Sequence, residues 1–475
     1  MMRSLFSGVA GLRTHQTRMD VIGNNIANVN TTAYKSQSMT FSDLMYQTTQ
    51  AASGANATTG VGGVNPRQIG LGAKTGAIKT AITSQGSAQT TNDPFDIMLT
   101  GQSFFVVSNG QDNFFTRDGS FYVDGMGNLV MTSNGYNVMG WEPDANDPTI
   151  IKKDVVTPLR VMQEKYMTYP PEATTQTQIT GIVDSLDTNV TSKDGRVVNL
   201  EFYDNKGYKY TARFTLHDAD TNKDDGMFYM QLEDILDSNG KSVTDSAGNK
   251  IVDSIKLTDA AGTDASAPTG VTRGTYIQYD VDNGSFINVG KASGDTATQT
   301  SIVLNFSSMT AVAEFPNFKN ITIDFSSTSN VNNNKTTTFE AVRGDAKSGN
   351  GAGRKTGEMS GINIQKDGKI YASYDNGQSR LLGQIAVANF ANPSGLAKEG
   401  DNLYSATMNS GEFNGIGDDI TEDGGYMNTG VLEMSNVDLS QEFTEMITTQ
   451  RGFQANSRII TVSDTLLEEL TNLKR

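Results

Sequence analysis

The chain contains two histidines, His15 and His217, the residue type that most often acts as the base in nucleophilic catalysis. A serine hydrolase needs a histidine in contact with both a serine and an acid. His15 falls in a predicted helix and His217 in an acidic loop, and nothing in the sequence brings them together. Carboxylates are plentiful, so a glycosidase pair stays an alternative, but acidic surface loops are the default explanation for them. The sequence therefore predicts no catalytic residue and no enzyme.

Two segments match ligand-binding loops only in part. Residues 218–222 begin like a calcium loop, but Lys223 stands where glycine is needed and Tyr229 where glutamate is needed. Residues 353–356 end like a phosphate-binding loop, but Arg354 occupies the required glycine. The absence of cysteine excludes disulfides, thiolate metal sites and cysteine cross-links between subunits. We therefore predict no metal and no cofactor.

The amino-acid composition limits the classes of partner that the protein can have. The 475 residues carry a net charge of −16, and 48 are glycine and 10 proline. An acidic surface repels phosphate backbones, so we expect no nucleic acid partner. No apolar run is long enough to span a membrane, and polar residues interrupt any signal-peptide core near the N-terminus. We expect either a cytoplasmic protein or one exported without a cleaved signal.

The longest regular element is predicted near the C-terminus, over residues 436–473. Its span is ~57 Å if it is fully helical. Ser435 or Asp438 is expected to cap it. Apolar residues recur with steps of four and seven, the repeat of helices that wind on one another, so this helix needs another helix or another chain. These residues are Leu439, Phe443, Met446, Phe453, Ile460 and Leu467.

A second amphipathic helix is predicted at the start of the chain, with Ser4 as its N-cap. It ends in the asparagine-rich residues 24–31, because asparagine is a poor helix former. The asparagine amides either cap a frayed helix end or bond to the backbone of a neighbouring subunit. The apolar stripe of this helix is formed by Leu5, Val9, Leu12, Met19, Ile22 and Ile26.

Between the two helices the pattern is that of short strands. Residues 78–141 alternate apolar runs with turns, and residues 114–117 and 121–123 flank Asp118-Gly119 in a predicted hairpin. Arg117 beside Asp118 is interpreted as a solvated turn pair. A looser, more acidic region follows, with a predicted hairpin at residues 197–214, before strands return over residues 362–390. The pattern predicts β domains nested between the helices.

Several stretches resemble the bacterial flagellar rod and hook protein family. Residues 24–31 with Tyr34 and Lys35 are similar to its N-terminal signature, and residues 435–438 and 450–456 to its C-terminal signature. Residues 101–105, 116–119 and 382–390 resemble its first β domain. Ala33 stands where the family usually has glycine. The resemblance is strong over residues 1–146 and 356–475 and weak between them.

The resemblance implies a multidomain, mainly β fold with antiparallel, barrel-like nested domains and terminal α-helices in a coiled-coil-like inner domain. The expected division is residues 1–30 with 431–475 as the inner-tube helices, 31–76 as a flexible connector, 77–146 with 345–430 as a first β domain, and 147–344 as one or two outer variable β domains.

The implied function is that of a hook-type subunit that polymerises into a curved extracellular tube, a universal joint that transmits torque from rod to filament. The implied partners are further copies of itself, the distal rod protein, the hook cap, the hook–filament junction proteins and the flagellar type III export apparatus. A distal rod protein, a surface adhesin or carbohydrate-binding β protein, and an extracellular hydrolase are the alternatives. The expected polymerisation interface comprises Leu5, Val9, Leu12, Met19, Ile22, Asn24, Asn25, Ile26, Asn28, Val437, Leu439, Phe443, Met446, Gln450, Phe453, Ile460, Leu467 and Leu470.

Overall fold

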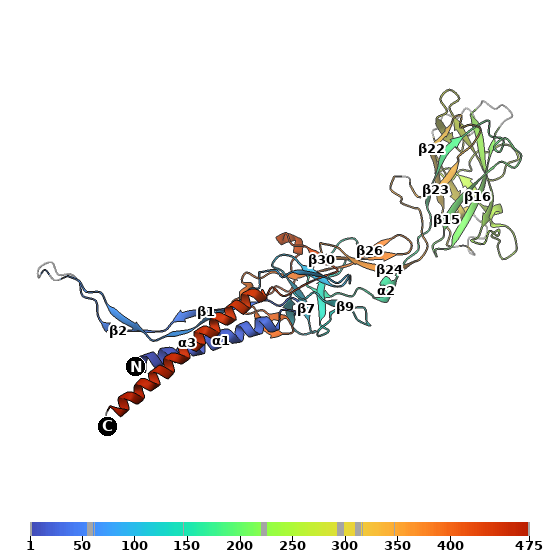
Figure 1. Ribbon diagram of the computed structural model, residues 1–475. Coiled ribbons are helices and arrows are strands. Elements are labelled where there is room, and N and C mark those ends of the chain that lie inside the picture. Colours follow the sequence, from blue (N-terminus) through green and yellow to red (C-terminus); the bar gives the residue numbers. More distant parts are fainter. Residues whose placement is uncertain are drawn as a thin grey trace. The chain divides into compact units, whose positions relative to one another are not determined.

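The structure is a computed structural model in which the chain forms two compact units (Figure 1). The first unit comprises Met1–Tyr166, Gly361–Ser373 and Ser379–Arg475, and the second comprises Met167–Ser360 and Tyr374–Gln378. No helix in the described part of the chain is long and apolar enough to cross a membrane. The structure describes residues 2–54, 60, 62–145, 147–219, 226–291, 299–308, 315, 317–345 and 347–473.

Both predicted terminal helices are confirmed. They are α1 (Met2–Ala27) and α3 (Leu439–Asn472), and they lie side by side in the first unit (Figure 1). Asp438 caps α3, because its side chain accepts hydrogen bonds from the backbone N–H groups of Ser440 and Gln441. The predicted cap at Ser4 is wrong, since Ser4 lies inside α1.

A two-part β ribbon follows α1, where a flexible connector was expected. β1 (Gln37–Asp43) pairs antiparallel with β4 (Ala73–Thr80), and β2 (Tyr46–Gln50) pairs with β3 (Arg67–Gly70). Glycine and small polar residues do not prevent pairing here, because the ladder satisfies the backbone groups of both arms. We call the β1–β4 pair the hairpin.

The β part of the first unit joins strands from two distant stretches of the chain. β26 pairs with β11, β27 with β7, β29 with β8, β30 with β6 and β31 with β5. A core containing Phe104, Phe115 and Trp141 fills this part. The bounds are β5 Ala88–Thr90, β6 Ile97–Leu99, β7 Phe104–Ser108, β8 Asn113–Thr116, β9 Phe121–Val123, β10 Leu129–Met131, β11 Asn137–Trp141, β12 Thr157–Pro158, α2 Glu164–Met167, β25 Lys369–Tyr374, β26 Ser379–Ile385, β27 Val387–Ala388, β28 Ala397–Gly400, β29 Leu403–Ser405, β30 Met427–Thr429 and β31 Val431–Glu433.

The predicted hairpin around Asp118-Gly119 is wrong. β8 pairs with β7 and β29, whereas β9 pairs with β10. The carbonyl of Gly119 accepts a hydrogen bond from the N–H of Ile97, and a Cβ on Gly119 would lie 1.7 Å from the Ile97 carbonyl oxygen. The glycine therefore allows one backbone to pass close to another. The Asp-Gly dipeptide is typical of a turn, so the sequence alone does not reveal this role.

The second unit contains two five-stranded sheets around one core. Their orders are β18-β21-β22-β14-β23 and β15-β16-β17-β19-β20, and residues of both sheets share one hydrophobic cluster. The predicted hairpin at residues 197–214 is confirmed as β15–β16. The bounds are β13 Thr168–Tyr169, β14 Gln176–Val183, β15 Arg196–Tyr203, β16 Lys209–Asp218, β17 Met227–Leu236, β18 Lys256–Thr258, β19 Gly274–Tyr279, β20 Phe286–Val289, β21 Ser301–Asn305, β22 Ile321–Asn330, β23 Glu340–Arg343 and β24 Gly357–Ile364, which continues into the first unit.

Ala33 keeps the left-handed conformation that suits glycine, with φ of 54°. Its side chain is buried, and its N–H donates to the carbonyl of Glu433 at 2.8 Å. In Ala33→Gly the relief of backbone strain is offset by the loss of a methyl contact and by a more flexible unfolded chain. We therefore expect the free energy of unfolding to change by less than about 1 kcal/mol. Ala33→Val puts a β-branched residue at positive φ and should destabilise by about 2 kcal/mol or more. Denaturant unfolding of the two variants tests this, and equal stabilities would contradict it.

Candidate assembly interface

The seam between α1 and α3 is made of small and polar residues. From α1 it uses positions spaced four and three apart, and the matching α3 positions run in the opposite direction, so the helices are antiparallel. A Cβ on Gly452 would lie 2.6 Å from Cε1 of His15, so the glycine allows this close approach. The facing pairs are Ser4 with Ser463, Gly8 with Ile460, Gly11 with Asn456, His15 with Gly452, Arg18 with Glu445, and Asn25 with Glu442.

Polar contacts hold this seam. The guanidinium of Arg18 lies 3.0 Å from the carboxylate of Glu445, and both side chains are partly exposed, so this pair contributes less than about 1 kcal/mol. Burial lowers the pKa of His15, and the charge on Arg18 lowers it further, which favours the neutral imidazole in the seam. Among the described residues of the two helices only two large apolar side chains, Val21 and Ile22, are buried, so the pair gains little from the hydrophobic effect.

The predicted apolar stripes do not form this seam between α1 and α3. The α1 seam lies one residue before the predicted stripe; of the stripe residues, Ile22 of α1 is buried and Ile460 of α3 lies against Gly8. Small residues allow a closer helix approach than leucine or phenylalanine do. The apolar residues of α3 therefore stay open to solvent: Leu439, Phe443, Phe453 and Leu467 are 38%, 50%, 38% and 37% exposed.

Three of the asparagine amides make hydrogen bonds within the chain, and the expected bonds to a neighbouring subunit stay a prediction. Asn25 is fully buried, donates to Glu442 and to the carbonyl of Gln37, and accepts from the N–H of Gln37. Asn24 donates to the hydroxyl of Tyr34, and Asn28 donates to the carbonyl of Asn24. These amides fix the chain as it leaves α1.

The remaining interface residues stay a prediction, and the single chain exposes them to different degrees. Ile22 and Asn25 are buried within the chain and are not available to a neighbour. Exposed members are Val9, Asn24, Leu439, Phe443, Gln450, Phe453, Leu467 and Leu470, and half-buried members are Leu5, Leu12, Met19, Ile26, Asn28, Val437, Met446 and Ile460.

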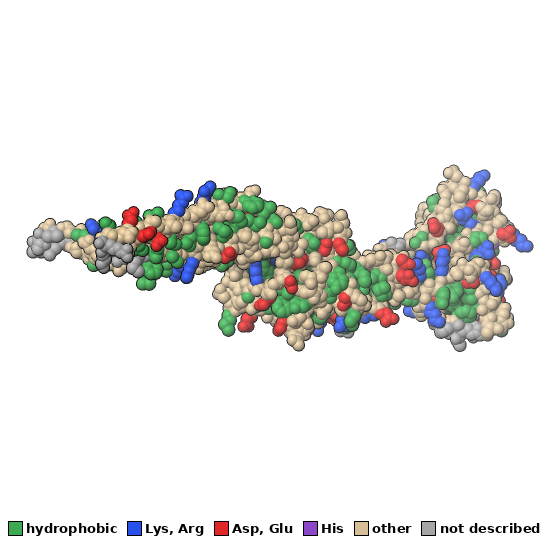
Figure 2. All heavy atoms as spheres, turned by 60° about the horizontal axis from the view of Figure 1, so that its bottom comes forward, with side chains coloured by type: hydrophobic (Ala, Val, Ile, Leu, Met, Phe, Trp, Pro, Cys, Tyr) green, Lys and Arg blue, Asp and Glu red, His purple; other side chains and the backbone are tan. Residues whose placement is uncertain are grey.

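Sequence reasoning missed a second set of exposed apolar residues on the helices. Four of them lie near the end of α3, and together with the already predicted Leu470 they step by three, four, four and three, a helical spacing that is visible in the sequence. Figure 2 shows hydrophobic side chains gathered on the part of the first unit formed by the helices and the hairpin. The missed residues are Phe6, Ile447, Ile459, Val462, Leu466 and Leu473.

A cavity of about 660 Å³ lies between α1 and the strands that follow it. Its apolar lining includes Phe6, Val9, Leu44 and Leu71. The α1 residues that line this cavity are neighbours of the seam residues along the helix but are not among them. The cavity therefore lies on another face of α1 than the seam with α3. We call it the α1–hairpin groove.

A buried charge cluster joins the segment that follows α1 to the segment that precedes α3. The ammonium of Lys35 lies 2.7 Å from Oε1 of Glu433, and both side chains are almost completely buried. Nε of Arg117 lies 3.7 Å from Oε2 of Glu433, and its terminal nitrogens donate to the carbonyls of Ser103 and Gly101. Burial lowers the pKa of Lys35, while the Glu433 carboxylate acts in the opposite direction. The prediction that Arg117 is a solvated turn residue is therefore wrong.

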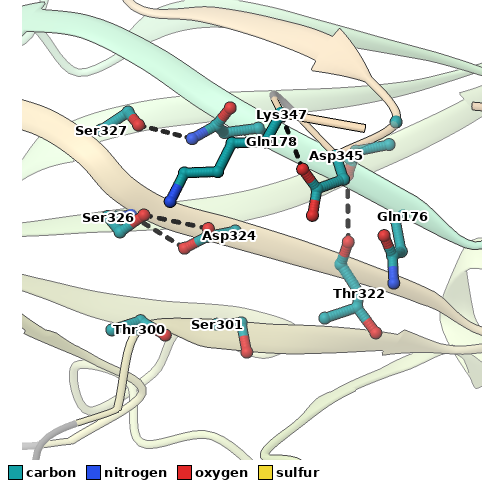
Figure 3. A pocket seen from close by; sticks show the side chains of 12 residues that line it. Gln176, Gln178, Thr300, Ser301, Thr322, Asp324, Ser326, Ser327, Asp345 and Lys347 are labelled. Atoms are coloured by element: carbon teal, nitrogen blue, oxygen red, sulfur yellow. Dashed lines mark hydrogen bonds between the residues drawn. The ribbon is translucent and has the colours of Figure 1, made fainter. Parts of the chain in front are cut away.

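The second unit carries a polar groove of about 490 Å³ beside β14 and β22 (Figure 3). Its side chains mainly bond to one another: Gln178 donates to Ser327, and Ser326 donates to Asp324. No histidine lines it, so it has no general base of the usual type. Hydroxyl, amide and carboxylate groups that satisfy each other are typical of a polar surface.

The two histidines have structural contacts. His15 lies in the helix seam, and His217 stacks on Tyr229 with ring centroids 4.9 Å apart. In the described residues no group of three histidine, aspartate or glutamate side chains could hold a metal. Of the predicted partial calcium loop, residues 220–222 and Lys223 lie outside the described residues.

Comparison with known proteins gives three family matches. Residues 5–35 match the model described as "Flagella basal body rod protein", residues 98–182 match "Flagellar hook protein FlgE/F/G D1 domain", and residues 428–473 match "Flagellar basal body rod FlgEFG protein C-terminal". The first and last of these ranges include most of α1 and α3.

Full-length relatives are similar as well. The chain is 34% identical to the flagellar hook protein FlgE of Treponema pallidum (strain Nichols) and 33% identical to that of Borreliella burgdorferi, and each comparison covers 100% of both chains. It is 27% identical to the flagellar basal-body rod protein FlgG of Bacillus subtilis (strain 168), again over 100% of both chains.

Proposed function

The chain belongs to the flagellar hook protein FlgE family and is a structural subunit of the flagellar hook, and on that premise we propose that its copies polymerise through their terminal helices into a curved, flexible tube. The tube acts as a universal joint that transmits torque from the rod to the filament. Subunit sliding on the outside of the tube, over polar and acidic surfaces, accompanies its rotation.

The observation that carries this proposal is the inverted pattern of the helix pair. Small and polar side chains face inward between α1 and α3, while large apolar side chains such as Phe443 face outward. An exposed apolar stripe on a soluble helix is unfavourable, and each leucine or phenylalanine gains about 1.5–3 kcal/mol when it is buried. Neighbouring copies supply that burial. The helices are therefore built for association between subunits more than for stability within one.

A distal rod subunit is the second candidate, since a basal-body rod protein is among the full-length relatives. The higher identity to hook proteins favours the hook. The two functions differ in the product of assembly, because a hook is curved and a rod is straight.

Further partners follow from the proposed place in the flagellum. We expect contacts with the distal rod protein, the hook cap and the hook–filament junction proteins, and export by the flagellar type III apparatus without a cleaved signal. The chain would catalyse no reaction and would bind no cofactor. The proposed domains are residues 1–30 with 431–475, 31–76, 77–146 with 345–430, and 147–344.

Electron microscopy of the purified, concentrated protein tests the proposed function. We expect curved tubes; straight tubes would favour the rod, and no polymer under any condition would contradict both. A chain lacking residues 147–344, closed with a short linker, tests the domain division in the same preparation. It should keep its β signal in circular dichroism, and complete unfolding would contradict the nested arrangement.

A further inference from the structure

The first unit carries two apolar surfaces that do not meet each other. One is the α1–hairpin groove, whose rim carries the cations of Arg13 and Lys74 beside the apolar lining. A groove of about 660 Å³ lined by Phe6, Val9 and Leu71 is large enough to take several aliphatic side chains.

The other surface is on the far end of α3. We call it the distal stripe: five residues at helical spacing on one face, flanked by the carboxylates of Glu468 and Glu469. From Asp464 to Leu473 the helix carries three acidic residues, Asp464, Glu468 and Glu469, and the next two residues of the sequence, Lys474 and Arg475, are basic. The stripe residues are Ile459, Val462, Leu466, Leu470 and Leu473, all exposed.

The two surfaces are separated within one chain. Ser463 of α3 lies opposite Ser4 of α1, and α3 continues past this point to Asn472. The groove lies on a face of α1 that does not touch α3, between Phe6 and Thr17. One helix cannot pack in the seam and fill the groove on another face of the same partner, so the stripe of a chain cannot occupy its own groove.

We propose that the distal stripe of a second copy's α3 occupies the α1–hairpin groove. Both surfaces are apolar, and the carboxylates of Glu468 and Glu469 beside the stripe complement the cations of Arg13 and Lys74 that line the groove. Because groove and stripe are different surfaces, the contact is head-to-tail, and repetition of such a contact builds an open helical polymer. The inference rests on the proposed function, since it names the contact by which the copies polymerise.

Cysteine cross-linking tests the contact, because the chain has no cysteine of its own. Val9→Cys combined with Leu470→Cys places one thiol in the groove and one in the stripe. Oxidation of assembled tubes should give a ladder of disulfide-linked oligomers on a non-reducing gel. Tyr122→Cys with Leu470→Cys is the matched control, since Tyr122 is an equally exposed apolar residue away from the groove, and it should give no ladder.

The outcomes separate this inference from the proposed function. Tubes that form normally but give no ladder with Val9→Cys, or give only a disulfide within one chain, overturn the docking and leave polymerisation intact. A parental chain that forms no tubes contradicts the proposed function itself. A ladder from the Tyr122 control at the same yield also overturns the specific contact.

A charge exchange supplies a second, independent measurement. Lys74→Glu should raise the protein concentration needed for assembly by about tenfold, because it places an acid beside the carboxylates of Glu468 and Glu469. Adding Glu469→Lys should restore most of this loss. Circular dichroism of the free subunit should not change, since both side chains are exposed. Lack of any effect of Lys74→Glu would count against the basic rim as part of the contact.

Discussion

Glu433→Ala is expected to lower the free energy of unfolding of the first unit by about 3–5 kcal/mol. The variant leaves the cations of Lys35 and Arg117 buried, without the carboxylate that lies 2.7 Å and 3.7 Å from them. A buried charge that loses its partner costs far more than the net contribution of the intact pair. The N–H of Gly86 also loses its acceptor, since it donates to Oε1 of Glu433.

Two controls make the Glu433 prediction specific. Glu433→Gln keeps the shape and one acceptor oxygen, so its cost should be smaller, about 1.5–3 kcal/mol. Glu201→Ala breaks an exposed ion pair with Lys209 in the second unit and should cost less than about 1 kcal/mol. Denaturant unfolding, followed by one probe in the first unit for the Glu433 variants and one in the second unit for Glu201→Ala, measures all three costs. A cost for Glu433→Ala no larger than that for Glu201→Ala would contradict the role of the cluster.

The sequence predicted the elements whose signals are local. The terminal helices follow from long stretches without proline and from apolar residues at helical spacing, and α3 begins after Asp438 because that side chain reaches two free N–H groups. The hairpin β15–β16 follows from two alternating runs around a turn at Gly207, which has a φ of 85°. In such cases a few neighbouring residues determine the backbone.

The errors concern contacts between distant parts of the chain. Arg117 resembles a turn residue beside Asp118, and its ion-pair partner Glu433 is 316 positions away, where no local pattern reveals it. Asp118-Gly119 has the composition of a hairpin, but the glycine serves a close crossing with Ile97. Neighbouring residues alone do not reveal either contact, because strands that come later in the sequence bury these residues.

The residues between the two helices could not be predicted for a different reason. Apolar residues at heptad spacing normally mark the face between two helices. Here that face holds glycine, histidine and charged residues, and Phe443 and its apolar neighbours are left exposed. A single sequence shows that apolar stripes exist but not whether the partner belongs to the same chain or to another. The structure of one subunit separates these cases, because it shows which stripes remain uncovered.

Phe443→Asp should abolish polymerisation without unfolding the subunit. In the single chain Phe443 is 50% exposed, so a carboxylate there stays in water and the free energy of unfolding should change by less than about 1 kcal/mol. In the polymer the same position is expected to be covered, and burying an unpaired charge costs several kcal/mol at every repeat. Circular dichroism of the subunit and electron microscopy after concentration measure the two effects separately.

Phe443→Leu is the matched variant for this prediction, because it keeps an apolar side chain at the same place and should still form tubes. Removal of residues 453–475 is the larger change: it deletes the distal stripe and more than half of α3, and should stop assembly while the β core stays folded. Tubes from Phe443→Asp at the normal protein concentration would show that this flank of α3 does not contact a neighbour. An unfolded Phe443→Asp subunit would show that the side chain supports its own chain instead. The apolar stripes serve assembly only if the Phe443→Asp subunit stays folded and also fails to form tubes. A residue that acts only in assembly contributes little to the stability of the single subunit.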